Sequence, residues 1–283
     1  PEGVMDDALH VDHVLRVPRE KLWWSKREMR ELTIPTEKKG EYLTIEFPDM
    51  AKMVAKLPRI LNNRGKDVAN WQFGLSSDFG YDPDPFTVSC VAWSEHSEVL
   101  YEVFSWKRKL LLPEQQLFIA RHVYETINPV YYVGDADGGG RPLVKGWSAG
   151  WVDRDPLPIQ PAEKRNKATF IAFVNNDIRT GKFLFLEDSP TYEEMKGLSW
   201  RIQRNGKRVE DVARDPETSS KKYPNDCSDA TLYNHRQARH HRTKEIDNPP
   251  KYGTDEYWAL EEKRMESAIL EEMEIEDELE WFQ

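Results

Sequence analysis

Three consecutive stretches of the chain have the hydrophobic and polar pattern of β-strands. Residues 71–75 alternate aromatic or aliphatic side chains with polar or small ones and lead to Asp78. A two-residue period of this kind is typical of a strand with one buried face. Residues 86–93 and 99–106 are rich in β-branched and aromatic side chains, and the polar residues 94–98 separate them. The pattern predicts three successive antiparallel strands.

A helical period comes next and leads into a short apolar run. Apolar residues recur every three or four positions within 113–128, and Pro113 suits the first turn of a helix. The run 130–133 then stops at Gly134 and Asp135. A short apolar run after a helix is typical of a buried strand in an α/β sheet, where functional groups collect at the carboxyl ends of the strands.

Weaker patterns predict further elements on both sides of this region. The sequence favours strands over residues 41–47 and 182–186. It favours helices over residues 50–61 and 164–180, and another that begins at Pro190 or the residue after it. Helices and strands therefore alternate along most of the chain, which predicts the α/β class.

Three aspartates occupy the ends of the predicted elements. Asp78 ends the first strand, and Asp135 ends the later apolar strand. Asp229 falls in the first turn of a helix that Asp226 or Ser228 can cap. Carboxylates are also common in ordinary turns and helix caps, so each aspartate taken alone is consistent with a purely structural role.

The order of these three sites resembles that of the nuclease domain of the large terminase subunit of tailed bacteriophages, which belongs to the ribonuclease-H-like superfamily. Three passages carry the resemblance: Asp78-Phe79-Gly80-Tyr81 with the downstream Asp84-Pro85, the strand that ends in Gly134-Asp135, and Asp229-Ala230-Thr231-Leu232-Tyr233. Each passage is moderately specific, and their order along the chain makes the match. The resemblance covers roughly residues 70–243.

The resemblance implies an α/β fold with a mixed central sheet, flanking helices and three parts along the chain. Residues 1–67 would form an N-terminal extension or linker region, residues 68–244 the ribonuclease-H-like nuclease domain, and residues 245–283 an acidic C-terminal tail. It further implies that the protein acts on double-stranded DNA in the host cytoplasm. The portal protein and the small terminase subunit would be its partners.

The resemblance also implies a set of metal ligands. Asp78, Asp135 and Asp229 would be the catalytic ligands, with Asp78 bridging two ions and Asp84 in an auxiliary role. Hard oxygen ligands without cysteine favour Mg²⁺ or Mn²⁺ over zinc. Two such ions can activate a water molecule and stabilise the leaving oxygen of a phosphodiester, which predicts an endonuclease. Because DNA would be held mainly through its phosphates, we expect little sequence specificity.

The formal net charge of −10 is unevenly distributed along the chain. Between Asp255 and Glu280 there are twelve acidic and two basic residues, a net charge of −10, so the remainder is about neutral. Global acidity therefore does not exclude DNA binding. The residues that we expect to face DNA are Arg201, Arg204, Lys207, Arg208, Lys221 and Lys222.

Several other activities lack their sequence signals. The Gly-x-x-x-x-Gly-Lys-Ser/Thr pattern of phosphate loops does not occur, so we expect no nucleotide hydrolysis by this polypeptide. The two cysteines, Cys90 and Cys227, indicate neither a disulfide framework nor a zinc site. The sequence has no apolar run of about 18 residues and no leader at Pro1, so we expect neither a membrane span nor a secretion signal.

Two other functional classes stay open at this point. Another ribonuclease-H-like DNA enzyme, a resolvase or a transposase, would share the fold and the metals. A transposase often ends its triad with glutamate, and a resolvase must bind a symmetric junction. A non-catalytic portal- or DNA-binding module would use the same acids as caps and turns. A pair of Mn²⁺ ions among Asp78, Asp135 and Asp229 would separate the catalytic reading from the last one.

Overall fold

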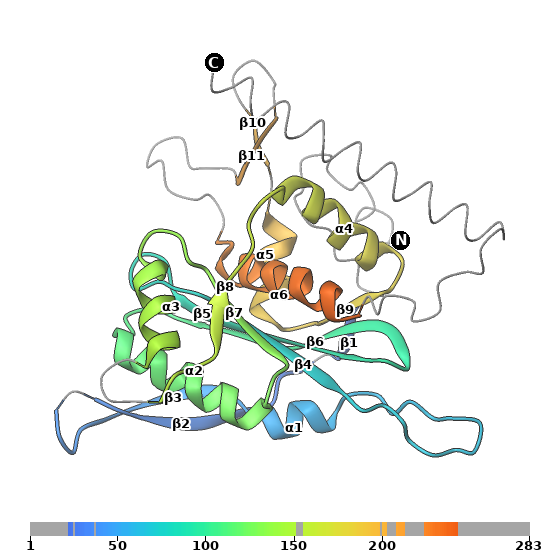
Figure 1. Ribbon diagram of the computed structural model, residues 1–283, viewed down its shortest axis with the longest axis horizontal. Helices are drawn as coiled ribbons and strands as arrows, with labels where there is room; N and C mark the ends of the chain where they lie inside the picture. Colours follow the sequence, from blue (N-terminus) through green and yellow to red (C-terminus); the bar gives the residue numbers. More distant parts are fainter. Residues whose placement is uncertain are drawn as a thin grey trace, which may run out of the picture. The chain divides into compact units, whose positions relative to one another are not determined.

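A seven-stranded mixed sheet lies at the centre of the fold (Figure 1). The middle strands run antiparallel to one another, as the sequence predicted, and the outer pairings on both sides are parallel. The α/β class with a mixed central sheet is therefore confirmed. In spatial order the strands are β1 (Leu22–Trp24), β9 (Phe183–Leu186), β6 (Ser97–Arg108), β5 (Phe86–Ser94), β4 (Gln72–Asp78), β7 (Tyr131–Gly134) and β8 (Ile159–Pro161).

This computed structural model describes most of the first 242 residues. The described ranges are 22–24, 26–36, 38–150, 155–198, 200–202, 208–212 and 224–242. The predicted acidic tail lies outside them, as do four of the predicted DNA-facing residues, Arg204, Lys207, Lys221 and Lys222.

Helices cover both faces of the sheet and enclose two apolar cores (Figure 1). The core on one face is shared with α1 (Met50–Ala55), α2 (Pro113–Ile127), α3 (Gly140–Ala149) and the antiparallel pair β2 (Met29–Pro35) and β3 (Tyr42–Pro48). The core on the opposite face is shared with α4 (Lys167–Arg179), α5 (Pro190–Gly197) and α6 (Asp226–Arg242). A separate antiparallel pair consists of β10 (Trp200–Ile202) and β11 (Arg208–Val212).

Burial on both faces of β5 explains why apolar residues occupy the consecutive positions 90–93 of its sequence. Every residue of this strand is buried. Cys90 and Ala92 point into the first core, whereas Val91 and Trp93 point into the second. Because successive side chains of a strand face opposite sides, a strand covered on both faces needs apolar residues at consecutive positions.

The described part of the first 67 residues folds together with the sheet. Strand β1 pairs in parallel with β9 at the edge of the sheet, and Ile34, Phe47 and Met53 are fully buried in the first core.

The contacts between residues divide the chain into two compact units, with the boundary between Arg242 and Thr243. None of the helices in the described part of the chain has the length and apolar content needed to cross a bilayer.

Helix α4 begins three residues later than predicted, at Lys167, and two other helices differ more from their sequence predictions. Helix α1 ends at Ala55, although its apolar period suggested a helix to residue 61. Helix α3 was not predicted, because the glycine run that begins at Gly138 has low helix propensity. The helix begins at the last of these glycines, Gly140, where a Cβ atom would lie 1.9 Å from the Asp135 carbonyl oxygen. The glycine therefore allows the start of α3 to approach the end of β7 closely.

The core of the sheet also contains one fully buried carboxyl group, that of Glu102 on β6. Its Oε2 accepts hydrogen bonds from the Leu186 main-chain N–H at 3.2 Å and from Ser189 Oγ at 2.8 Å. Burial raises the pKa of Glu102 above the usual 4.5, although these hydrogen bonds act in the opposite direction.

We expect Glu102→Gln to stabilise the protein at neutral pH. A raised folded-state pKa means that the folded protein holds this proton more tightly than the unfolded chain, so the stability of the wild type falls as the pH rises above about 4.5. A neutral glutamine removes that loss, and the gain should shrink as the pH is lowered toward 4.5. Urea unfolding between pH 4 and pH 8 measures the difference, with the exposed Glu125→Gln as control. A gain that does not change with pH would contradict this account.

Candidate functional site

Asp78 and Asp135 lie side by side at the ends of two parallel strands. In the pairing of β4 with β7, Ser77 is opposite Gly134, and the Asp135 N–H donates to the Ser77 carbonyl oxygen at 2.9 Å. The next residue of each strand is therefore an aspartate. The strand-end positions that the sequence predicted for both residues are confirmed.

The two-residue period of β4 and β7 directs both carboxylates toward α6. On β4, the Gly74 carbonyl accepts a hydrogen bond from Asn234 of α6, and Ser76 Oγ donates to the Ala230 carbonyl at 2.6 Å. Asp78 follows at the same parity and therefore faces the same side. On β7, Tyr131 and Val133 belong to the core beneath α6, so Asp135 also faces that helix.

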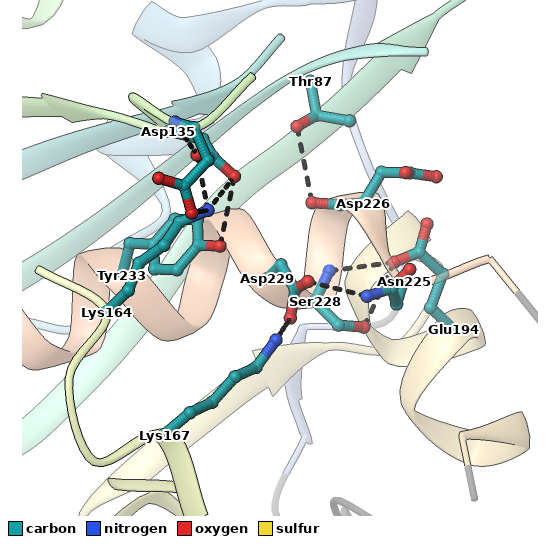
Figure 2. Close-up of polar contacts among 11 residues, drawn as sticks. Thr87, Asp135, Lys164, Lys167, Glu194, Asn225, Asp226, Ser228, Asp229 and Tyr233 are labelled. Atoms are coloured by element: carbon teal, nitrogen blue, oxygen red, sulfur yellow. Dashed lines mark hydrogen bonds and ion pairs between the residues drawn. The ribbon is translucent and has the colours of Figure 1, made fainter. Parts of the chain in front are cut away.

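Asp229 lies in the first turn of α6, the helix that faces Asp78 and Asp135. Its main-chain N–H donates to the Asn225 carbonyl at 2.8 Å, and its Oδ2 accepts from Asn225 Nδ2 at 2.6 Å. This reciprocal contact fixes both the start of the helix and the orientation of the carboxylate (Figure 2). The prediction that Asp229 lies in a first helical turn is confirmed.

Buried polar contacts hold the start of α6 against the sheet. Thr87 Oγ1 accepts from the Asp78 N–H at 3.2 Å and donates to the Asp226 carbonyl at 3.4 Å, so it links the end of β4 to the helix. Glu194 Oε2 accepts from the N–H of Ser228 at 2.8 Å and from its hydroxyl at 3.1 Å (Figure 2). Lys107 Nζ lies 2.5 Å from the same carboxylate. The position of Asp229 therefore depends on three neighbouring elements.

Tyr233 lies one helical turn after Asp229 and connects α6 to Asp135. Its hydroxyl donates to Asp135 Oδ2 at 3.3 Å (Figure 2). Burial raises the pKa of Tyr233 far above its usual value, and the negative charges of Asp229, Asp135 and Asp78 raise it further. The phenol therefore stays protonated at neutral pH. Through this hydroxyl the helix that carries Asp229 is joined to Asp135, which lies beside Asp78, so the structure brings the three predicted aspartates to one region of the fold.

Two lysines, which we did not predict as site residues, contact the carboxylates. Lys164 Nζ lies 2.5 Å from the Asp135 carboxylate and 2.9 Å from Asp137 Oδ2, and Lys167 Nζ lies 2.8 Å from Asp229 Oδ1 (Figure 2). Burial acts to lower the pKa of Lys164, but the hydrogen bonds and charges of Asp135 and Asp137 outweigh it, and the pKa is raised. Lys164 is therefore a cation at neutral pH.

The donor set suits a hard divalent cation. Asp78, Asp135 and Asp229 offer oxygen ligands only, and two of these carboxylates already have an ammonium group within 3 Å. In the described part of the chain, no three His, Cys, Asp or Glu side chains are already gathered at metal-binding spacing. A divalent cation bound here would compete with these lysines for the carboxylate oxygens.

Three other predicted site residues belong to described elements or loops. Asp84 belongs to the exposed loop between β4 and β5, where the neighbouring Asp82 pairs with Lys109 at 3.5 Å. Arg201 and Arg208 lie on β10 and β11, which pair antiparallel. The sequence missed Tyr233, Thr87 and the two lysines as site residues, although the four-residue spacing of Asp229 and Tyr233 places both on one face of a helix.

Neither a protein-family model nor a curated protein matches this chain. Solved structures do. The large terminase nuclease from the thermophilic phage G20c with bound magnesium has a TM-score of 0.51 and 13% identity, over 80% of this chain and 98% of that one. The same nuclease with bound cobalt has a TM-score of 0.50 and 11% identity, again over 80% of this chain and 98% of that one. The large terminase nuclease domain of bacteriophage SPP1 with bound manganese has a TM-score of 0.43 and 14% identity, over 63% and 93%.

The matches to the two G20c structures establish the fold: at such low identity they show that this chain has the fold of that large terminase nuclease. The resemblance that the three aspartate passages indicated is therefore confirmed at the level of the fold.

Proposed function

We propose that this protein is a metal-dependent endonuclease that cleaves double-stranded viral DNA, with little sequence specificity, during genome packaging. The observation that carries the proposal is that β4 and β7 end side by side in Asp78 and Asp135, and that Tyr233, one turn after Asp229 on α6, donates to Asp135 Oδ2 at 3.3 Å. Carboxylates brought to one region of the fold repel one another, so a role as ordinary turns and caps does not account for the arrangement. A non-catalytic module is therefore the weaker reading.

The chemistry requires that these residues bind cations and keep their own orientation. Two Mg²⁺ or Mn²⁺ ions, when bound, would activate a water molecule and stabilise the leaving oxygen of the phosphodiester. Asp78 would bridge the two ions, Asp135 and Asp229 would each bind one, and Asp84 would assist from its loop. Tyr233 orients Asp135 through its hydroxyl, and Asn225 orients Asp229.

We further propose how the substrate and the partners are held. DNA would be bound mainly through its phosphates by the basic cluster Arg201, Arg204, Lys207, Arg208, Lys221 and Lys222. Contacts of this kind position the duplex without reading its sequence. The portal protein and the small terminase subunit would be partners in the host cytoplasm.

The purified protein should degrade two unrelated plasmids at similar rates when Mn²⁺ or Mg²⁺ is present, and chelation of the metal should stop the reaction. Agarose electrophoresis of nicked, linear and fragmented products measures this. Absence of cleavage with both metals would reject the nuclease function. Strong preference for a four-way junction over linear duplex would instead assign a resolvase.

A further inference from the structure

The segment that carries both site lysines is fixed against one face of α6. Arg236, two turns after Asp229, donates from Nε to Glu163 Oε2 at 3.0 Å and also contacts the Arg165 carbonyl. Its guanidinium lies 4.7 Å from the centre of the Phe170 ring. The side chain of Arg236 is 13% exposed and that of Glu163 is 47% exposed, so the arginine end of this anchor is largely buried while the carboxylate remains accessible to water.

This anchor places two ammonium groups on two different carboxylates. Lys164 contacts Asp135 and lies 5.4 Å from the centre of the Tyr233 ring, and Lys167 contacts Asp229. The contacting side chains are between 15% and 36% exposed, so their attraction is less screened than that of a surface pair. Both aspartates are therefore held by cations that belong to the chain itself.

We propose that Lys164 and Lys167 are exchangeable counter-ions. They hold Asp135 and Asp229 until divalent cations take these carboxylates, and their released ammonium groups then bind phosphates of the DNA backbone. The inference rests on the proposed function, because the exchange matters only if the carboxylates bind metal.

Formal charges give the physical reason for the exchange. A lysine brings one positive charge to its carboxylate, whereas a divalent cation brings two, so the cation is the stronger partner at short range. An ammonium group that has lost its carboxylate then lies near a dication that repels it, and an anion becomes its favoured partner. A DNA phosphate is an anion of the required kind, within reach of a flexible lysine side chain. Metal binding and DNA binding should therefore strengthen each other by the same factor.

The first test measures Mn²⁺ binding without DNA, by calorimetry and by the spin-resonance signal of free Mn²⁺. Removing a competing partly buried ion pair of about 1 kcal/mol should tighten binding about fivefold in Lys164→Met and in Lys167→Met. Lys164→Arg keeps the positive charge and should bind Mn²⁺ like the wild type. Lys182→Met removes a lysine that pairs with Glu98 at 2.9 Å elsewhere on the protein, and it should leave Mn²⁺ affinity unchanged.

The second test measures binding of a phosphorothioate duplex that resists cleavage. In the wild type this duplex should tighten Mn²⁺ binding, and the coupling should shrink in the double variant of Lys164 and Lys167. The salt dependence of DNA binding in Mn²⁺ should fall by a slope of about 0.9 for each lysine removed. If the salt slope of DNA binding and the coupling between DNA and Mn²⁺ are both unchanged in the double variant, the proposed binding of the released lysines to DNA phosphates is overturned.

Mn²⁺ affinity that is unchanged or weaker in both methionine variants would overturn the counter-ion role. If Lys164→Met does not fold, the more exposed Lys167 decides the question alone. The proposed function can fail separately. If the protein cuts no DNA but the methionine variants bind Mn²⁺ more tightly, the nuclease function is rejected and the counter-ion role is supported. If the protein cuts DNA but the variants bind Mn²⁺ like the wild type, the counter-ion role is rejected and the nuclease function stands. If neither the wild type nor any variant binds Mn²⁺, both ideas are rejected.

Discussion

Replacing Asp78 with alanine should reduce DNA cleavage about a thousandfold, because the loss of a bridging ligand removes several kcal/mol of transition-state stabilisation. The folded protein should be at least as stable as the wild type. Asp78 lies beside Asp135 at the ends of two paired strands. Removing Asp78 takes a like charge away from Asp135, while Lys164 and Lys167 still hold Asp135 and Asp229.

Plasmid cleavage rates and thermal unfolding of the same preparations test this pair of effects. Asp135→Ala and Asp229→Ala should lose activity to a similar degree, whereas the exposed Asp155→Ala should keep it. Undiminished cleavage by the three site variants would refute the assignment. A loss of activity that follows a loss of stability would show that the aspartates are structural caps.

Much of this site could be predicted because its residues lie at the ends of regular elements. The alternation that leads to Asp78 and the apolar run that leads to Asp135 each define a strand and its end, and parallel pairing then brings both ends to one edge of the sheet. The position of Asp229 could be predicted for the same reason, since the first turn of a helix can be recognised from the sequence. The pattern therefore places these three residues without any knowledge of the tertiary contacts.

Lys164 and Lys167 could not be predicted as site residues, because no periodic pattern of hydrophobic residues indicates where their side chains lie. Lys164 precedes α4, and the direction of its side chain depends on the long-range contact between Glu163 and Arg236. The sequence favoured a helix from residue 164, which would have turned Lys164 into an ordinary first-turn residue. A contact between segments about 70 residues apart leaves no trace in local hydrophobic spacing.

Buried polar residues were missed for a related reason. Asn234, on α6, is fully buried, although a polar residue in a helix is usually a sign of an exposed face. Its Nδ2 donates to the carbonyls of Gly74 and Ser89, each at 3.0 Å, and its Oδ1 accepts from the Tyr131 hydroxyl at 2.6 Å. This one side chain ties the helix that carries Asp229 to β4, β5 and β7 of the sheet.

We therefore expect Asn234→Ala to lower the free energy of unfolding by about 3 kcal/mol, the largest stability loss that we predict, because the buried carbonyls of Gly74 and Ser89 each lose a donor at about 1 to 3 kcal/mol. The Tyr131 hydroxyl keeps a partner, since it also donates to the Asn234 main-chain carbonyl at 2.8 Å. Asn234→Asp retains the acceptor for Tyr131 but loses both donors, so it should not rescue the protein. Gln237→Ala, at a partly exposed position of the same helix, should cost less than about 1 kcal/mol.

Urea unfolding measures these differences, and Mn²⁺ binding below the transition separates stability from function. Asn234 does not contact the carboxylates directly but positions α6, so the fraction of Asn234→Ala that remains folded should bind Mn²⁺ more weakly, because Asp229 loses its fixed approach to Asp78 and Asp135. A variant with full stability would show that water replaces the amide without cost. Lost stability with unchanged Mn²⁺ affinity would mean that the contacts of Thr87 and Glu194 at the start of α6 suffice to hold Asp229.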